Sequence, residues 1–367
     1  MKHANSIAPQ NGDLLVIVGT VKGVFIFRSD RNRREFQIAG PYFKGQAVFS
    51  TAYLPDKRAP RILVGHMSMH WGALVSWSDD FGASWHEPED GNVKFPPGSG
   101  LTLSAVWALE RAPLIGADVV FAGADPAALF RSDDRGETFR PVESLLNHHE
   151  RPYWMPGAGG LCLHTILPDP RDPKRILVGI SSAGMYRSDN GGDSWTRRNQ
   201  GVKMEGGPPH APHFGPQCAH KMRYDAKNPA RIYLQNHPGV YRSDDGGDSW
   251  IDIAEGLPSV FGFPLVAHPS RGDTAYLIPL ESDTFRVPLE ARSRSGARAT
   301  PARHGSRSGP DCPSATATSR CFATRSLPTA WIPRGSISAR AAANCSRRAT
   351  RAKAGLRSPI GCLRCCA

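Results

Sequence analysis

The chain alternates short hydrophobic runs with polar, glycine-rich segments, a pattern typical of many short β-strands joined by turns. Four runs of similar character occupy residues 61–65, 119–123, 175–179 and 231–234, and each precedes a second run, at residues 74–77, 128–131, 185–187 and 240–242. No stretch of about 18 consecutive apolar residues interrupts this alternation, so the sequence predicts no membrane-spanning helix. The pattern therefore indicates an all-β protein.

An eight-residue polar pattern, S-x-(D/N)-x-G-x-(S/T)-(W/F), directly follows each second run. Its copies begin at Ser78, Ser132, Ser188 and Ser243, which are 54, 56 and 55 residues apart. We expect each copy to be a hairpin turn in which the acid or amide accepts backbone N–H groups and the glycine takes a positive φ. The turn residues are Asp80, Gly82, Trp85, Asp134, Gly136, Phe139, Asn190, Gly192, Trp195, Asp245, Gly247 and Trp250. A period of this size predicts a repeat fold.

The pattern resembles the Asp-box (BNR) repeat of sialidase-like and YVTN-BNR-like β-propellers, over residues 14 to about 290. The resemblance implies four-stranded blades, with innermost strands at residues 47–54, 101–109, 161–167, 217–224 and 260–268. A decayed fifth copy begins at Ser29. The first blade, starting at Leu14, matches a second strand and has no inner strand of its own. The turns are expected on one face, and the long loops at residues 86–100, 141–160 and 197–216 on the other.

Charge and cysteine are distributed unevenly, and this divides the chain into three parts. Residues 291–367 hold 15 of the 45 Lys and Arg and one acid, Asp311, so residues 1–290 carry 30 basic and 32 acidic residues, a net of −2. The overall charge of +12 thus gives no sign of nucleic-acid binding by the repeats. We expect a polar segment at 1–13, propeller blades at 14–290, and a disordered basic tail at 291–367 that holds six of the eight cysteines.

The tail also suggests a slip of the reading frame between about residues 285 and 295. If each hidden codon takes the third base of one residue and the first two bases of the next, residues 297–305 permit S-R-D-A-G-A-T-W and residues 347–355 permit S-R-D-E-G-E-S-W. Two further turns would then begin 55 and 50 residues on, continuing the period. We therefore expect seven blades in the intact frame and about five to six in the chain as printed.

Candidate chemistry lies in the long loops and adjoining strand ends, which are rich in histidine and aromatic residues. We expect the mouth of the propeller channel to bind a ligand, with His66, His70, Trp71, Trp154, His164, His220 and His237 as candidates. Two matching Cys-x-His pairs, Cys162 with His164 and Cys218 with His220, invite a zinc interpretation. Equivalent positions on successive blades are related by rotation and do not readily converge, so we expect no metal site.

Function is the least determined property. We expect a cytoplasmic binding scaffold that needs no cofactor and takes a small molecule, glycan or protein, without contact to nucleic acid or membrane. The alternative is a sialidase-like glycoside hydrolase, which needs a pair of acids from the long loops, such as Glu87, Asp90, Glu143, Glu150 or Glu205. The early Phe/Tyr-Arg-Ile-Pro motif of sialidases is missing, and no arginine triad can be assigned. No catalytic residue is predicted.

Overall fold

The computed structural model describes residues 2–3, 7–56, 59–70, 72–157, 159–203, 217–288 and 296–299, which form six β-sheets. The first sheet orders its strands as β1 (Lys2–His3), β4 (Gln37–Tyr42), β3 (Gly23–Ser29) and β2 (Leu14–Thr20). The second contains β5 (Ala47–Leu54), β6 (Arg61–Ser68) and β7 (Gly72–Ser78), and the third β8 (Ala105–Arg111), β9 (Val120–Asp125), β10 (Leu129–Ser132) and β11 (Arg140–Pro141). Two short helices, α1 (Glu143–Leu146) and the 3-10 helix η1 (Arg151–Tyr153), follow β11.

The fourth sheet contains β12 (Leu163–Pro168), β13 (Ile176–Ile180), β14 (Gly184–Ser188) and β15 (Thr196–Arg197). The fifth repeats this order with β16 (Ala219–Tyr224), β17 (Ile232–Asn236), β18 (Gly239–Ser243) and β19 (Ile251–Asp252). The sixth contains β20 (Leu265–Ala267), β21 (Thr274–Leu277) and β22 (Gly296–Ala299).

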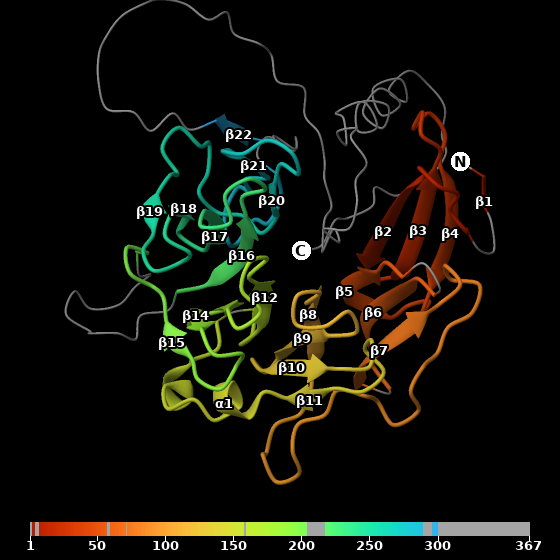
Figure 1. Ribbon diagram of the computed structural model, residues 1–367, viewed down its shortest axis with the longest axis horizontal. Coiled ribbons are helices and arrows are strands. Elements are labelled where there is room, and N and C mark those ends of the chain that lie inside the picture. Colours follow the sequence, from red (N-terminus) through yellow and green to blue (C-terminus); the bar gives the residue numbers. More distant parts are fainter. Residues whose placement is uncertain are drawn as a thin grey trace, which may run out of the picture.

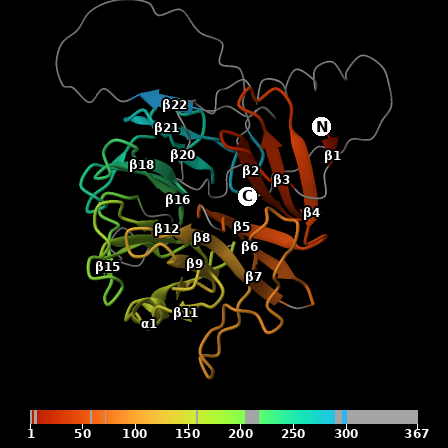
Figure 2. The ribbon, with the colours of Figure 1, turned by 45° about the vertical axis from the view of Figure 1, so that its right-hand side comes forward.

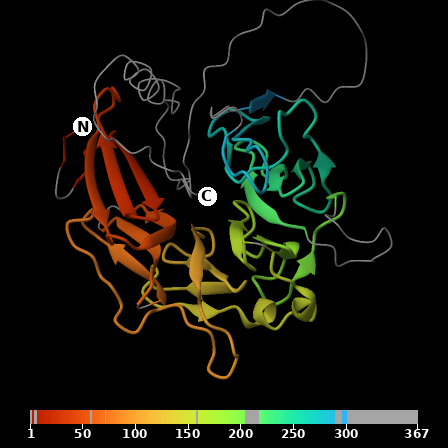
Figure 3. The same ribbon diagram turned by 180° about the vertical axis from the view of Figure 1, so that it is seen from behind.

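The sheets follow one another around an arc, with the innermost strands β5, β8, β12, β16 and β20 in sequential contact (Figures 1 and 2). Seen from behind, the arc runs from the first sheet to the sixth around a central space (Figure 3). Separate hydrophobic clusters fill the interfaces between successive sheets. Radially arranged, up-and-down four-stranded sheets define a β-propeller, so the predicted fold class is confirmed.

The glycines of the second strands show where β2 belongs. Gly65, Gly123 and Gly179 lie on β6, β9 and β13, and each packs so closely on the inner strand of the next blade that an added Cβ would lie 2.5–3.1 Å from an atom of that strand. Gly19 of β2 packs in the same way, 2.6 Å from Val48 on β5. We conclude that β2 is a second strand, as the sequence predicted. Among the described residues, none forms an inner strand for this blade.

The four repeated turns have the expected internal hydrogen bonds. In the last copy, the Ser249 amide and hydroxyl donate to the two carboxylate oxygens of Asp245, at 3.0 and 2.5 Å, and the Gly247 amide donates to Ser243 Oγ at 2.8 Å. Gly247 has a φ of +93°, in the left-handed region that favours glycine. Asp80 and Asp134 accept the same bonds in their copies. In the third copy the Ser194 amide donates to Asn190 Oδ1, and Asn190 Nδ2 donates to Ser194 Oγ. The acids of these turns are therefore braces of the backbone.

The aromatic residue that ends each turn reaches the preceding blade as well as its own hairpin. Trp195 Nε1 donates to Ser144 Oγ at 3.0 Å, and Trp250 Nε1 donates to the Arg198 carbonyl oxygen at 2.8 Å. Arginine side chains also link neighbouring blades. Arg61 pairs with Asp79 in its own blade and with Glu137 in the turn of the next blade. The turns thus fasten neighbouring blades together.

The expected basic tail lies almost wholly outside the described residues. The part described, Gly296–Ala299, pairs as β22 with β21 in the sixth sheet, with Thr274 opposite Ala299. No helix in the described part of the chain is long and apolar enough to cross a membrane.

Candidate functional site

Four inner strands are interrupted by a β-bulge at the same structural position. The register shifts lie between Val48 and Ser50 on β5, between Val106 and Ala108 on β8, and at the equivalent places on β12 and β16. The residues at the bulges are Phe49, Trp107, His164 and His220. A bulge inserts an unpaired residue and changes the direction of its side chain. Each of these blades therefore carries one ring at its bulge.

These four side chains and Phe263 form a continuous series of ring contacts, which we name the aromatic belt. Ring centroids lie 5.0 Å apart for Phe49 and Trp107, 5.2 Å for Trp107 and His164, and 6.2 Å for His164 and His220. Phe263, just before β20, stacks on His220 at 4.4 Å with an interplanar angle of 22°. All belt residues except His220 are partly exposed. The belt thus presents both aromatic faces and imidazole nitrogens.

Charged residues lie beside the belt on the same inner strands. Trp107, Glu110, His164, Lys221 and Arg223 all line one cavity of about 10 Å³, which is space for a single water molecule. Burial raises the pKa of the Glu110 carboxyl, and the positive charges of Arg223 and Lys221 oppose that rise. Burial lowers the pKa of the Arg223 guanidinium, and Glu110 opposes this shift. The opposite charges of Glu110 and Arg223 thus stabilise each other in this confined space.

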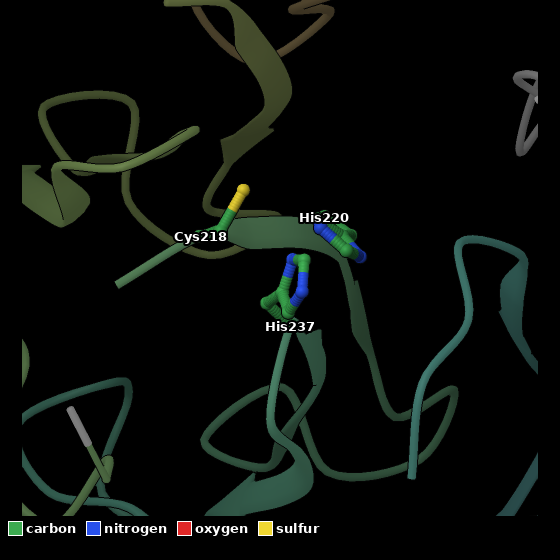
Figure 4. Close-up of side chains that lie close together, drawn as sticks. All are labelled: Cys218, His220 and His237. Carbon is green, nitrogen blue, oxygen red and sulfur yellow. The ribbon is translucent and has the colours of Figure 1, made fainter. Parts of the chain in front are cut away.

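Cys218, His220 and His237 gather at one end of the belt (Figure 4). Their ligand atoms all lie within 4.8 Å of one another. Cys218 precedes β16 and His237 follows β17, and the His237 amide donates to the Cys218 carbonyl oxygen at 3.0 Å. Burial lowers the pKa of His220 to about 4, so its imidazole is neutral near pH 7. Sequence reasoning weighed only the two Cys-x-His pairs of successive blades, and it did not anticipate a cluster that includes His237.

The three residues can converge because they all belong to one blade. Cys218 and His220 come from β16 and its start, and His237 comes from the hairpin partner β17, so no rotation between blades separates them. The other Cys-x-His pair is used differently: Cys162 Sγ donates to the Gly159 carbonyl oxygen at 3.3 Å. Of that pair, only His164 belongs to the belt, through its ring contact with His220.

The remaining predicted ligand residues do not join this cluster. His66 lies within β6 rather than at its end, buried between Gln46 and Ser76. His70 is exposed in the turn before β7, and Trp71 lies outside the described residues. Trp154 is buried, and its Nε1 donates to the Tyr186 hydroxyl at 2.8 Å. His66 and Trp154 are therefore parts of the packed interior.

Two of the long loops share a groove away from the belt. Its volume is about 470 Å³, and it is lined by Pro96, Pro97, Gly98, Ser99, Leu101, Glu143, Leu146, Asn147 and Arg151. The groove brings together residues of the loops that follow β7 and β11. Asn147 donates to the Glu143 carboxylate at 3.0 Å. One carboxylate faces this groove, whereas glycoside hydrolysis normally requires two.

The other predicted acids are not paired for catalysis. Glu87 and Asp90 are exposed, and Glu205 lies outside the described residues. Glu150 accepts the Tyr186 hydroxyl at 2.7 Å and lies 3.5 Å from Arg197, so it holds a loop in place.

Two partly buried carboxyls of the third blade have raised pKa values, Glu110 and Asp125, in each case mainly through burial. Asp125 pairs with Ala105, five residues before Glu110 along β8. The bulge takes up one of these residues, since Glu110 pairs with Phe121, four residues before Asp125 on β9. At about 3.3 Å per residue the backbones of the two acids are therefore about 13 Å apart along the strand, beyond the roughly 5–10 Å between the carboxyls of a glycosidase pair.

Sequence reasoning missed Phe49 and Trp107, although a signal for them exists. When the inner strands are aligned, Phe49, Trp107, His164 and His220 occupy the same position, 29, 25, 24 and 23 residues before the following turn. Every one of these residues carries a ring. That alignment would have identified the belt, but not the bulges that direct its side chains.

The fold and the belt define the chain as a β-propeller with an aromatic, imidazole-rich inner surface. No protein-family profile matches it. Among curated proteins, the xyloglucanase Xgh74A of Acetivibrio thermocellus is 26% identical over 156 residues, covering 39% of this chain. The chain spans 17% of that enzyme's length.

Two solved structures match parts of the chain. The GH74 xyloglucanase from Xanthomonas campestris is 16% identical with a TM-score of 0.43, over 77% of this chain and 51% of that one. The β-propeller domain of Cps50 (Swd1) from Myceliophteria thermophila is 10% identical with a TM-score of 0.49, over 78% and 80% of the two chains.

Proposed function

We propose that the protein is a glycan-binding β-propeller whose ligand lies against the aromatic belt. The observation that carries this proposal is the bulge repeated in four inner strands, which presents a ring from each. Bulges are over-represented beside functional sites because they re-aim side chains. Partly exposed rings offer flat apolar faces to a sugar, while Glu110 and Arg223 beside them supply an acceptor and a donor for its hydroxyl groups.

The partial likeness to a xyloglucanase supports a glycan as the ligand class. It also favours a second candidate function, a glycoside hydrolase. Binding is preferred because Glu110 and Asp125, the acids with raised pKa values near the belt, are too far apart along the third blade to act on one bond.

Titration of the full chain with a xyloglucan oligosaccharide tests both candidates. We expect binding in the wild type, and at least about fivefold weaker binding in Trp107→Ala, because a stacking ring is worth about 1 kcal/mol or more. Trp154→Phe is the matched control, since Trp154 packs in the interior away from the belt. Equal affinity in Trp107→Ala and wild type would refute the site. New reducing ends that disappear in Glu110→Gln would favour the hydrolase.

We further propose that the repeated turns are Asp boxes and that the chain is divided at about residues 13 and 290. The side-chain bonds within the turns support the first point. The second-strand character of β2 supports a propeller whose frame continues beyond residue 290. Sequencing the gene tests the slip: codons for residues 297–305 that cannot encode S-R-D-A-G-A-T-W in the shifted frame would refute it.

A further inference from the structure

We propose that Cys218, His220 and His237 bind a transition-metal ion, with zinc the best fit, through one thiolate and two imidazoles. The three ligand atoms lie within 4.8 Å of one another. Ligands at about 2.0–2.3 Å from a tetrahedral zinc ion are about 3.5 Å apart. Small side-chain rotations therefore close the site. This inference goes beyond the proposed function, because it does not depend on any glycan.

His220 is oriented as metal-binding histidines usually are. Its Nδ1 lies 2.7 Å from the Gly262 carbonyl oxygen, an acceptor that has no proton to give. Nδ1 therefore donates this bond, which leaves the lone pair on Nε2 for a metal. An outer hydrogen bond of this kind fixes the tautomer and the ring orientation. Phe263 stacks on the same ring at 4.4 Å and holds its plane.

Backbone geometry brings the other two ligands together. The His237 amide donates to the Cys218 carbonyl oxygen at 3.0 Å, so the two residues are opposite each other at the ends of paired strands. The bulge at His220 displaces that residue from the regular alternation of β16 and brings its ring to 5.4 Å from the His237 ring. Figure 4 shows the three side chains close together on the two strands.

The neighbouring blade provides an internal comparison. There the Ser181 amide donates to the Cys162 carbonyl oxygen at 2.8 Å, which is the bond that His237 makes in the fifth blade. Ser181 Oγ accepts the Cys162 amide and donates to the Gly160 carbonyl oxygen. The fourth blade thus has the Cys-x-His pair with serine in the third place, whereas the fifth blade has histidine there. That substitution completes a set of ligands.

A Cys-His-His set suits zinc and its neighbours in the first transition series, and excludes magnesium and calcium as preferred ions. Three protein ligands leave the fourth tetrahedral position open. The Asp283 carboxylate lies beside the site, with Oδ2 at 3.8 Å from His237 Nε2. We infer that water or an exogenous donor completes the coordination.

The test compares bound zinc and cobalt in full-length variants. Because residues 291–367 hold six other cysteines, each measurement is a difference between chains that share this tail. We expect the wild type to retain one more equivalent of zinc than His237→Gln after gel filtration. With Co²⁺, the wild type should show the visible bands of a tetrahedral site and a thiolate charge-transfer band, and Cys218→Ser should lose the latter.

Cys162→Ser is the matched control, since it removes the equivalent thiol of the neighbouring blade and should keep the extra equivalent. Circular dichroism identifies any variant that fails to fold, and Ser181→Ala provides a second folded reference. Equal zinc content in the wild type and folded His237→Gln would overturn the proposal. So would loss of the extra equivalent in Cys162→Ser. Glycan binding without the extra zinc would refute the metal proposal alone. Zinc binding without glycan affinity would refute only the glycan proposal.

Discussion

Protonation of His66 should make the fold sensitive to mild acid. His66 is 1% exposed, and burial lowers its pKa from the ordinary 6.5 to about 4. Its Nδ1 lies 2.7 Å from Gln46 Oε1 and its Nε2 lies 2.8 Å from Ser76 Oγ. The amide oxygen can only accept, so Nδ1 donates and Nε2 accepts the serine hydroxyl. Both nitrogens are therefore satisfied in the neutral imidazole, which also stacks on Phe43 at 4.1 Å.

The sign follows from the lowered folded-state pKa. The unfolded chain takes up a proton at His66 below about pH 6.5, whereas the folded chain does so only near pH 4. The stability that neutral His66 contributes is thus fully present above pH 6.5 and is lost as the pH falls from 6.5 to 4. Between pH 7 and pH 5 this linkage amounts to about 2 kcal/mol.

Urea unfolding followed by tryptophan fluorescence at pH 7 and pH 5 measures this effect. Other groups also titrate, so the informative quantity is the difference between the wild type and His66→Gln. Glutamine can donate to Gln46 and accept from Ser76 without titrating. We expect the variant to lose about 2 kcal/mol less stability than the wild type across this interval.

His70→Gln is the matched control, because His70 is exposed and its replacement should leave the pH dependence unchanged. Parallel pH profiles for the wild type and His66→Gln would refute the assignment of this linkage to His66.

Two further predictions concern packing and turns. Gly123→Ala should lower the free energy of unfolding by about 2 kcal/mol or more, since its Cβ would lie 2.5 Å from the Leu163 carbonyl oxygen, whereas Gly159→Ala meets nothing within 4 Å; similar urea midpoints for the two would contradict the close approach of the blades. Asp245→Ala should cost about 1–2 kcal/mol by leaving the Ser249 amide and hydroxyl without their acceptor; an unchanged thermal melting temperature would show that this turn is not braced by its acid.

The sequence predicts the blades well because each turn needs particular residues at fixed places. Gly247 at positive φ and Asp245 bonded to Ser249 are local requirements, so they leave a visible motif. The inner strand at residues 47–54 was predicted with the bounds that β5 has. Local chemistry and a regular period are sufficient for this part of the fold.

The site was predicted less well because it depends on non-local geometry. His164, His220 and His237 were identified as candidates, and the structure brings them together. His66 was selected by the same pattern, yet it is a packed residue of another blade. Whether a histidine on a strand faces the centre or a neighbouring sheet depends on a bulge of one residue. That bulge is a property of strand pairing, which has no clear signature in the residues themselves.

The repeated bulge has a consequence for how such a protein can change. Three blades contribute a side chain to the belt from a position that is only partly packed, as the partial exposure of Phe49, Trp107 and His164 shows. Replacing that side chain alters the inner surface without altering the strand that carries it. The belt can thus acquire a new specificity through successive single substitutions, one blade at a time. The turns at the far ends of the hairpins meanwhile keep the blades assembled.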